Sequence, residues 1–332
     1  MMKLTLIGGV IAIGLVVAFG LYLFVLGLRN VDRAVASSHW PRIAGKVVRS
    51  DTREQHDVDR ETRVASVIYS ADTVIQYEVA GKQYSTNLIH FGQTLGSGDA
   101  SEAELQRLRY PVNGAVPVSY DPSRPWIAAA RPGLHAEAFW LPGAGLAFLL
   151  PAAVALFVFL TVFGAESQQS DVVAPVVAGF LAAVFCGLGI LALSSGAQRL
   201  WRGAASLDWP SVEGTVLFSR VNASETEDSD HRRSTTFSPQ FVYTYEVGGV
   251  KHFNNRRRFG QIEGSGEDWA EDIATRYRPG KAVRVYYFQA DPDVAVLEPG
   301  NNSEGLWLPG IGLVALLFGL ATLIWIVPAV AK

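Results

Sequence analysis

The sequence predicts a membrane protein of mixed class, in which four transmembrane helices carry two homologous small β domains. Three observations lead to this fold class. Four long apolar runs lack Asp, Glu, Lys and Arg, two polar blocks lie between the paired runs, and the two blocks repeat each other's motifs. We expect each block to fold as a five-stranded β domain with one short helix.

Each apolar run is long enough to cross a bilayer as a helix, which takes roughly 20 residues. The first run is longer than the roughly 7–15 residues of a signal peptide's apolar region, so we expect an uncleaved anchor. None of the runs holds an ionisable residue, which disfavours a transporter or a channel. The expected transmembrane helices are 4–28, 138–164, 172–197 and 305–330.

The two polar blocks are copies of one unit. The octapeptide FGQTLGSG at Phe91–Gly98 returns as FGQIEGSG at Phe259–Gly266. The unit helix, domain, helix is therefore present twice, and its β domains, at 37–133 and 205–300, are expected on the same side of the membrane. The matching pairs are Trp40 with Trp209, Tyr77 with Tyr245, Phe91 with Phe259, Gly92 with Gly260, and Trp140 with Trp307.

The order of motifs within a block is distinctive. A Trp-Pro pair at Trp40-Pro41 precedes a Gly-x-Val strand, a Tyr-rich strand and the turn Tyr120-Asp121-Pro122. This pattern resembles the DUF3592 family, a domain of unknown function found between two membrane helices. The resemblance covers nearly the whole chain, twice, and implies the fold and a bacterial plasma membrane. It carries no catalytic residues to transfer.

Each block is expected to contain three strands, a helix and two strands, an order found in five-stranded OB-type barrels. A small open sandwich would give the same order. In the first block Ser101, with Glu104 three residues on, has the spacing of a helix capping box. The expected helices are Ala100–Arg109 and Asp268–Tyr277; the expected strands are 45–50, 67–80, 83–91, 115–120 and 126–130, then 214–220, 240–247, 250–259, 282–288 and 294–297.

The octapeptide follows the third expected strand and leads into the helix. A glycine-rich turn before a helix N-terminus can bind phosphate. However, the spacing is neither a P-loop nor a dinucleotide fingerprint, and no Lys-Ser/Thr pair follows. We interpret it as a structural corner whose glycines adopt positive φ.

Two charged segments, 51–63 and 222–233, are expected to be long loops after the first strand of each domain. Acidic oxygens with an imidazole could hold a divalent ion there. The spacing differs between the copies and arginines stand among the candidates, so solvated loops are favoured. The candidates are His56, Asp57, Asp59 and Glu61, then Glu225, Glu227, Asp228, Asp230 and His231.

A basic run, Arg256-Arg257-Arg258, replaces Leu88-Ile89-His90 of the first copy. Contact with lipid headgroups or with nucleic acid would use such a run. Acidic residues outnumber basic ones in 205–304, which argues against nucleic acid as a partner. A patch that compensates neighbouring acids is the favoured interpretation.

Catalytic, cofactor and metal sites are not predicted, because the histidines are scattered and no hydrolase motif occurs. The leading hypothesis is a non-enzymatic membrane protein whose β domains bind or scaffold another macromolecule, with the lipid bilayer and a protein as partners. The alternatives are a metal-dependent hydrolase using the charged segments and a toxin-immunity or accessory membrane protein.

Positive residues near membrane helices favour the cytoplasmic side. On the domain side of the membrane stand five arginines, whereas only Lys3 and Lys332 flank the other side. We therefore expect the β domains in the cytoplasm of a bacterium rather than in the periplasm. The five residues are Arg29, Arg33, Arg131, Arg199 and Arg202.

Overall fold

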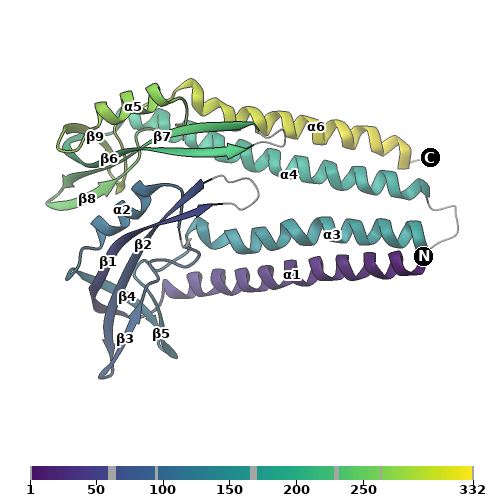
Figure 1. The fold of residues 1–332 in the computed structure, drawn as a ribbon, viewed down its shortest axis with the longest axis horizontal. Helices are drawn as coiled ribbons and strands as arrows, with labels where there is room; N and C mark the ends of the chain where they lie inside the picture. The colour runs from purple at the N-terminus through teal and green to yellow at the C-terminus, as the bar shows by residue number, and fades with distance from the viewer. Residues whose placement is uncertain are drawn as a thin grey trace.

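The computed structural model describes residues 2–58, 65–93, 96–164, 170–227, 232–261 and 264–330. Two β domains lie side by side at one end of a set of long helices, and both chain termini lie at the other end (Figure 1). Both domains thus leave the helices in the same direction, as the repeated unit requires.

The long helices form two hairpins, one for each copy. Glycines let the partner helices approach closely, because a Cβ at Gly27 would lie 2.2 Å from Pro142, and one at Gly196 would lie 2.6 Å from Pro309. Small residues have this role in membrane helix pairs. The hairpins pair α1 (Met2–Ser37) with α3 (Trp140–Gly164), and α4 (Ser170–Ala205) with α6 (Trp307–Val330).

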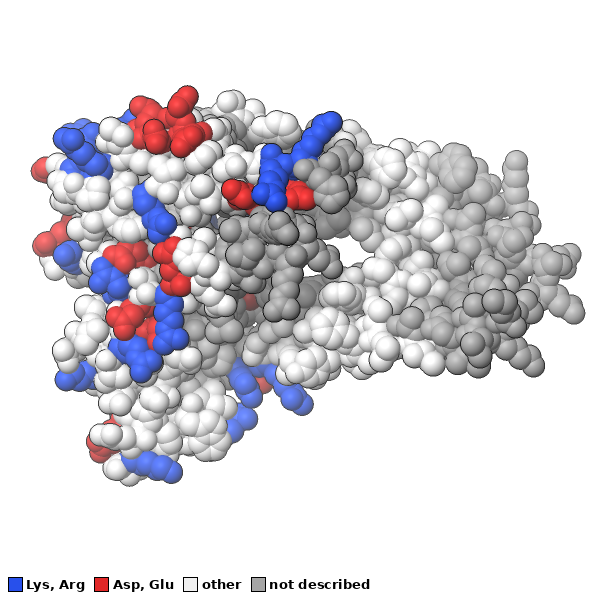
Figure 2. All heavy atoms as spheres, in the orientation of Figure 1, with Lys and Arg blue, Asp and Glu red and all other residues white. Residues whose placement is uncertain are grey.

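Three helical segments in the described part of the chain are long and apolar enough to cross a membrane: Gly14–Ser37, Ala136–Leu156 and Val177–Asp208. Trp307–Thr322 of α6 is a shorter apolar helix. Large side chains such as that of Leu188 are exposed on these segments. On the face seen in Figure 2, charged residues gather over the domains, and the described helix surface away from them is uncharged. This apolar exposed surface fits a lipid environment.

Each domain is built on one antiparallel five-stranded sheet, with the strand orders β3-β2-β1-β4-β5 and β10-β9-β6-β7-β8. The expected order of three strands, a helix and two strands is confirmed in both copies. The elements are β1 (Arg42–Val58), β2 (Ala65–Val79), β3 (Lys82–Thr86), α2 (Ala100–Arg109), β4 (Ala115–Asp121) and β5 (Arg124–Ala129), then β6 (Ser211–Glu227), β7 (Arg233–Val247), β8 (Val250–Asn254), α5 (Glu267–Arg276), β9 (Ala282–Phe288) and β10 (Asp291–Val296).

The third strand of each domain ends earlier than predicted, at Thr86 and Asn254. The chain after it turns toward the other edge of the sheet. The hydroxyl of Thr86 donates to the carbonyl of Ala128 at 2.8 Å, and the N–H of Arg131 donates to the carbonyl of Ile89 at 2.7 Å. These bonds curl the sheet around its apolar core.

The charged segments 51–63 and 222–233 are wrongly predicted as loops, because most of each is strand. β1 continues to Val58 and β6 to Glu227, and both pair with the next strand along this length. Beyond the core the hairpins have two exposed faces, so the alternation that identifies a half-buried strand is missing there. The β1–β2 and β6–β7 hairpins both extend from the domains toward the long helices (Figure 1).

The helix α2 has the predicted bounds, but its N-cap lies two residues earlier than the capping box suggested. Its N-cap is Asp99 rather than Ser101, and the Asp99 carboxylate accepts from the Ser101 N–H at 2.8 Å. Asp is as good an N-cap as Ser, and here it precedes the first helical residue. In the second copy the N-cap position belongs to Gly266, without a side-chain bond.

The two domains contact each other through Gln240 of β7, whose side chain reaches the start of α2. The Gln240 amide oxygen accepts from the Ala100 N–H at 3.0 Å, and its amide nitrogen donates to the Gly98 carbonyl at 3.2 Å. The residue is only 5% exposed. A buried amide with both ends satisfied fixes one relative placement of the domains.

The contact around Gln240 is asymmetric. Asn255 donates to the hydroxyl of Ser101 at 3.0 Å, and Arg109 donates to the carbonyl of Phe253 at 2.9 Å. At this contact the first domain uses its helix α2, whereas the second uses β7, β8 and the residue after β8. Because the two domains use different surfaces there, the contact is heterologous, or head to tail. The equivalent strands β1 and β6 also meet at the interface.

Candidate functional site

The repeated octapeptide lies where each domain meets its helices. Phe91 and Phe259 are buried, and each contacts the tryptophan of its own Trp-Pro pair edge to face. The ring centroids are 5.7 Å apart both for Trp40 with Phe91 and for Trp209 with Phe259. The two copies thus place these residues in equivalent positions, with both tryptophans half-buried.

Only the first glycine of each octapeptide has the positive φ predicted for its glycines, +85° at Gly92 and +70° at Gly260. Its backbone lies against the short 3₁₀ helices η1 (Ala136–Phe139) and η3 (Ser303–Leu306), which lead into α3 and α6. A Cβ at Gly92 would lie 2.5 Å from Ala138, and one at Gly260 would lie 2.9 Å from Gly305. Glycine is therefore required for both its conformation and its size.

Sequence reasoning missed a serine that locks the same junction. Ser37 and Ser206 are fully buried, and their hydroxyls accept from the N–H of Gly133 at 2.8 Å and of Gly300 at 2.9 Å. The end of the first helix is thereby joined to the end of its domain. The repeated spacing Ser-x-x-Trp-Pro was the available signal.

The remaining repeat pairs also match in environment. The Tyr77 hydroxyl donates to the Pro125 carbonyl at 2.7 Å, and the Tyr245 hydroxyl donates to the Pro292 carbonyl. Burial raises the pKa of Tyr77 to about 12. Trp140 and Trp307 begin α3 and α6 and are 69% and 70% exposed, as residues of an interfacial aromatic belt would be.

A pocket lies beside the octapeptide corner in each copy. In the second copy it has a volume of about 380 Å³ and is lined by Arg199 and Arg202 of α4 and by Arg256, Arg258 and Gln261 of the domain. In the first copy the pocket is about 620 Å³, and the positions equivalent to the first three arginines are Asn30, Arg33 and Leu88.

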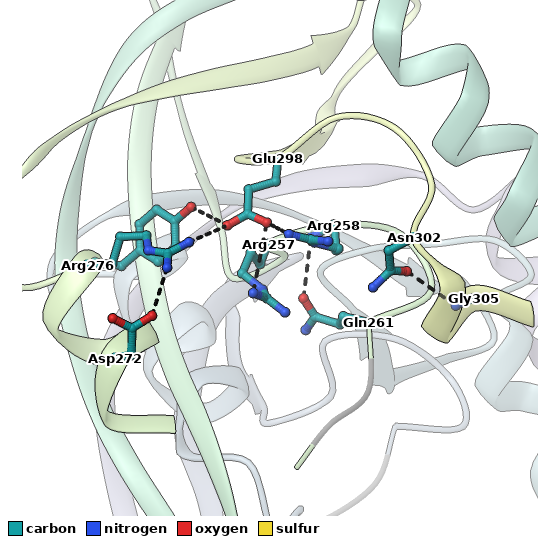
Figure 3. A network of polar contacts seen from close by, with 9 residues as sticks. Arg257, Arg258, Gln261, Asp272, Arg276, Glu298, Asn302 and Gly305 are labelled. Atoms are coloured by element: carbon teal, nitrogen blue, oxygen red, sulfur yellow. Dashed lines mark hydrogen bonds and ion pairs between the residues drawn. The ribbon is translucent and has the colours of Figure 1, made fainter. Parts of the chain in front are cut away.

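The arginine run divides into two parts. Arg257 and Arg258 both pair with Glu298 (Figure 3). The Glu298 carboxylate also accepts from the hydroxyl of Tyr277 at 2.7 Å. Arg276 reaches the same carboxylate at 4.0 Å. For these two residues the run compensates a neighbouring acid, as the sequence favoured.

The guanidinium of Arg256 lies instead over the ring of Phe259, with its Cζ 5.1 Å from the ring centroid. It keeps contact with solvent, yet crowding by protein atoms lowers the pKa of its guanidinium, and the charges of Arg202 and Arg199 lower it further. No carboxylate among the described residues pairs with these three arginines. The pocket is therefore a local concentration of positive charge.

The candidate metal ligands give no site in the part of the chain that the structure describes. There, no three His, Cys, Asp or Glu side chains group closely enough to hold an ion. Glu227 pairs with Arg233 at 3.2 Å, and His56 lies 3.3 Å from Glu54. The side chain of Asp57 and the residues Asp59, Glu61, Asp228, Asp230 and His231 lie outside the described residues.

The histidines are less scattered than the sequence suggested. The rings of His90 and His135 lie 4.9 Å apart beside the first octapeptide corner, and His252 pairs with Asp293 at 2.8 Å. Burial lowers the pKa of His90. Asp293 is also perturbed: burial would raise the pKa of its carboxyl, but the His252 hydrogen bond and the charge of Arg109 lower it overall.

A comparison with known protein families shows which family the chain belongs to. The family described as "Domain of unknown function (DUF3592)" matches residues 44–135 and 212–302, which together are more than half of the chain. The protein belongs to the DUF3592 family. Its two DUF3592 domains are tandem copies, and each match covers nearly the whole sheet, the octapeptide corner and the return toward the long helices. None of the curated proteins searched matches the chain.

Proposed function

We propose that this DUF3592 protein is a non-enzymatic membrane protein with four transmembrane helices, and that its two domains form one platform that binds another protein. The observation that carries the proposal is the head-to-tail contact through Gln240. It uses a buried amide, bonded at both its oxygen and its nitrogen, to hold the domains in one arrangement. A fixed arrangement presents a composite surface that neither domain has alone.

The fourth membrane helix is supported by the equivalence of the two hairpins. In α6, the described apolar segment Trp307–Thr322 continues to Val330 without a charged residue. Gly312 packs against α4 where a Cβ would lie 2.8 Å from Leu193, as Gly145 packs against Phe24 in the first hairpin. The curled sheets are consistent with OB-like barrels.

The head-to-tail contact uses the start of α2 in the first domain and Gln240 in the second. The equivalent surface in the other copy is left out of the contact in both cases. The start of α5 corresponds to the start of α2, and the β2 residue Asp72 corresponds to Gln240. Asp72 pairs instead with Arg49 at 3.0 Å and Arg53 at 2.6 Å. These surfaces fit a protein partner better than a small substrate, because they are open faces of a helix and a sheet.

For sidedness we propose a bacterial plasma membrane with the domains in the cytoplasm. Arg29 and Arg33 at the end of α1, and Arg199 and Arg202 at the end of α4, support this orientation because positive flanks are retained inside. A phosphatase fused after Lys332 is expected to be active outside the cytoplasm. Cytoplasmic fluorescence of a reporter at the same point would reverse the orientation.

Cross-linking of the full chain in nanodiscs, followed by mass spectrometry, tests the binding platform. We expect one stoichiometric protein partner whose cross-links span both domains and are lost in Gln240→Ala. Asp72→Ala, at the equivalent position of the first copy, should retain them. Absence of a stoichiometric partner, together with a hydrolytic turnover that His231→Ala abolishes, would establish the enzyme alternative.

A further inference from the structure

The pocket beside the second octapeptide corner joins two parts of the chain that are distant in sequence. Arg199 and Arg202 come from α4, whereas Arg256 comes from the segment after β8. Ser195, Gln198, Arg199 and Arg202 follow the spacing i, i+3, i+4 and i+7, which places them on one face of the helix. That face, with its hydroxyl, amide and guanidinium groups, forms one wall.

The sequence of α4 indicates where this wall lies relative to the membrane. The charge-free stretch 172–198 ends at Arg199, so Arg199 and Arg202 are the first ionisable residues at the domain end of the helix. Trp201, between them, is 69% exposed, as is common for tryptophan at headgroup level. The pocket therefore lies where the phosphates of a bilayer would be.

Four arginines line the pocket, and one of them, Arg258, pairs with Glu298. The other three, Arg199, Arg202 and Arg256, have no carboxylate partner among the described residues, and their like charges repel one another. A bound anion would offset the repulsion, since arginine pairs with phosphate through charge-assisted, bidentate hydrogen bonds. The side chain of Gln261 lines the same pocket and adds a neutral polar group.

The first copy supplies an internal comparison. Its equivalent pocket holds Asn30 and Leu88 where the second has Arg199 and Arg256. Only Arg33 matches an arginine of the second pocket. The same backbone corner thus occurs with and without the concentrated charge, so the octapeptide alone does not require it.

We infer that the pocket formed by Arg199, Arg202 and Arg256 binds a phosphate-bearing anion at the membrane surface. The group arrives either as the headgroup of an anionic lipid or as a free phosphate. Binding would attach the second domain to the end of α4 and fix its distance from the bilayer. This inference does not depend on the identity of any protein partner.

The test uses the full chain in detergent and native mass spectrometry with phosphatidylglycerol or phosphatidylcholine at equal concentration. The wild type is expected to retain phosphatidylglycerol preferentially. The double variant Arg199→Asn/Arg256→Leu, which installs the residues of the first copy, should lower that preference roughly tenfold or more, and the loss should grow weaker at high salt. Arg278→Leu, an exposed arginine outside the pocket, should leave it unchanged.

A second arm distinguishes the two sources of phosphate. Inorganic phosphate is titrated into the full chain in phosphatidylcholine nanodiscs, and hydrogen exchange is followed at Arg256–Gln261. Saturable protection that the double variant lacks, without a lipid preference, would assign a free phosphate group. Lipid preference and phosphate protection that are both equal in the wild type and in a folded double variant would overturn the inference.

Discussion

Between helix and sheet the first domain has Thr73 of β2 facing Gln106 of α2. At the equivalent positions the second domain has Phe241 of β7 and Ile273 of α5, both in its apolar core. In the first domain the Gln106 amide donates to the Thr73 hydroxyl at 3.1 Å, beside a polar pocket of about 120 Å³. In the second, Phe241 contacts Tyr277 at 5.3 Å and the space is filled by apolar side chains.

The comparison shows which features the fold requires in both copies. The Trp-Phe contact, the positive-φ glycine and the buried serine are the same, because they join the domain to its helices. The layer between helix and sheet has diverged, since either a hydrogen bond or close apolar packing can fill it. The second copy consequently has the more apolar core, and the first keeps polar groups next to the domain interface.

The largest effect is expected at the shared junction. Trp209→Ala should lower the free energy of unfolding by about 3–5 kcal/mol, the range of large-to-small changes in a core. Trp40→Ala should cost less, because Trp209 contacts Phe288 at 5.6 Å in addition to Phe259. Chemical unfolding of the full chain in detergent, followed by near-UV circular dichroism, measures both. Equal and negligible effects would show that the junction does not stabilise the domains.

Exchanging residues between the helix–sheet layers should have unequal effects. Ile273→Gln should cost about 2–4 kcal/mol, because it removes apolar packing and buries an amide. Gln106→Ile should cost only roughly 1 kcal/mol, because it leaves the Thr73 hydroxyl without its partner while adding apolar surface. The same unfolding experiment compares them. Similar costs would mean that the two layers are equally tolerant.

How far the sequence predicts this structure depends on the feature. The helices, the repeat and the octapeptide corner are predicted because apolar length and glycine placement are local signals. The outer parts of β1 and β6 are missed because both faces are exposed and carry charges such as Arg53 and Glu225. The arginine-lined pocket is missed because Arg199 and Arg256 are far apart in the sequence and become neighbours only in the folded protein.

The domain interface should respond to a single amide. Gln240→Ala leaves the Ala100 N–H unpaired and removes one of two donors to the Gly98 carbonyl, which keeps Asn222 at 3.1 Å. It should weaken domain docking by about 1–3 kcal/mol. Asp72→Ala, its counterpart in the first domain, removes surface ion pairs and should cost about 0–1 kcal/mol. Hydrogen exchange at residues 98–103 in nanodiscs reports the docking. Unchanged protection in Gln240→Ala would show that the Gln240 contact does not hold the domains in their arrangement.

The smallest effect concerns pH. Burial lowers the pKa of His90 below the ordinary histidine value of about 6.5, so the folded junction prefers the neutral ring. The stability contribution is present above that value and is lost as the pH falls through the folded pKa, because the unfolded chain then binds more protons. The second copy has Arg258 at this position and should not respond.

Hydrogen exchange near Phe91 and Phe259, compared at pH 7.5 and pH 5.5 after correction for intrinsic rates, measures this difference. Protection should fall near Phe91 and stay constant near Phe259. His90→Asn should abolish the response of the first copy. A decline of equal size in both copies would assign the pH effect to another group.

Cysteine cross-linking tests the head-to-tail arrangement most directly. Cys186 is the single cysteine of the chain and can be replaced by alanine. In that background Ser101→Cys/Asn255→Cys should form a disulfide on oxidation, because the side chains of these residues touch at 3.0 Å. The reciprocal pair, Asn87→Cys/Asp268→Cys, should remain reduced. Cross-linking of the reciprocal pair, or of neither pair, would contradict the arrangement.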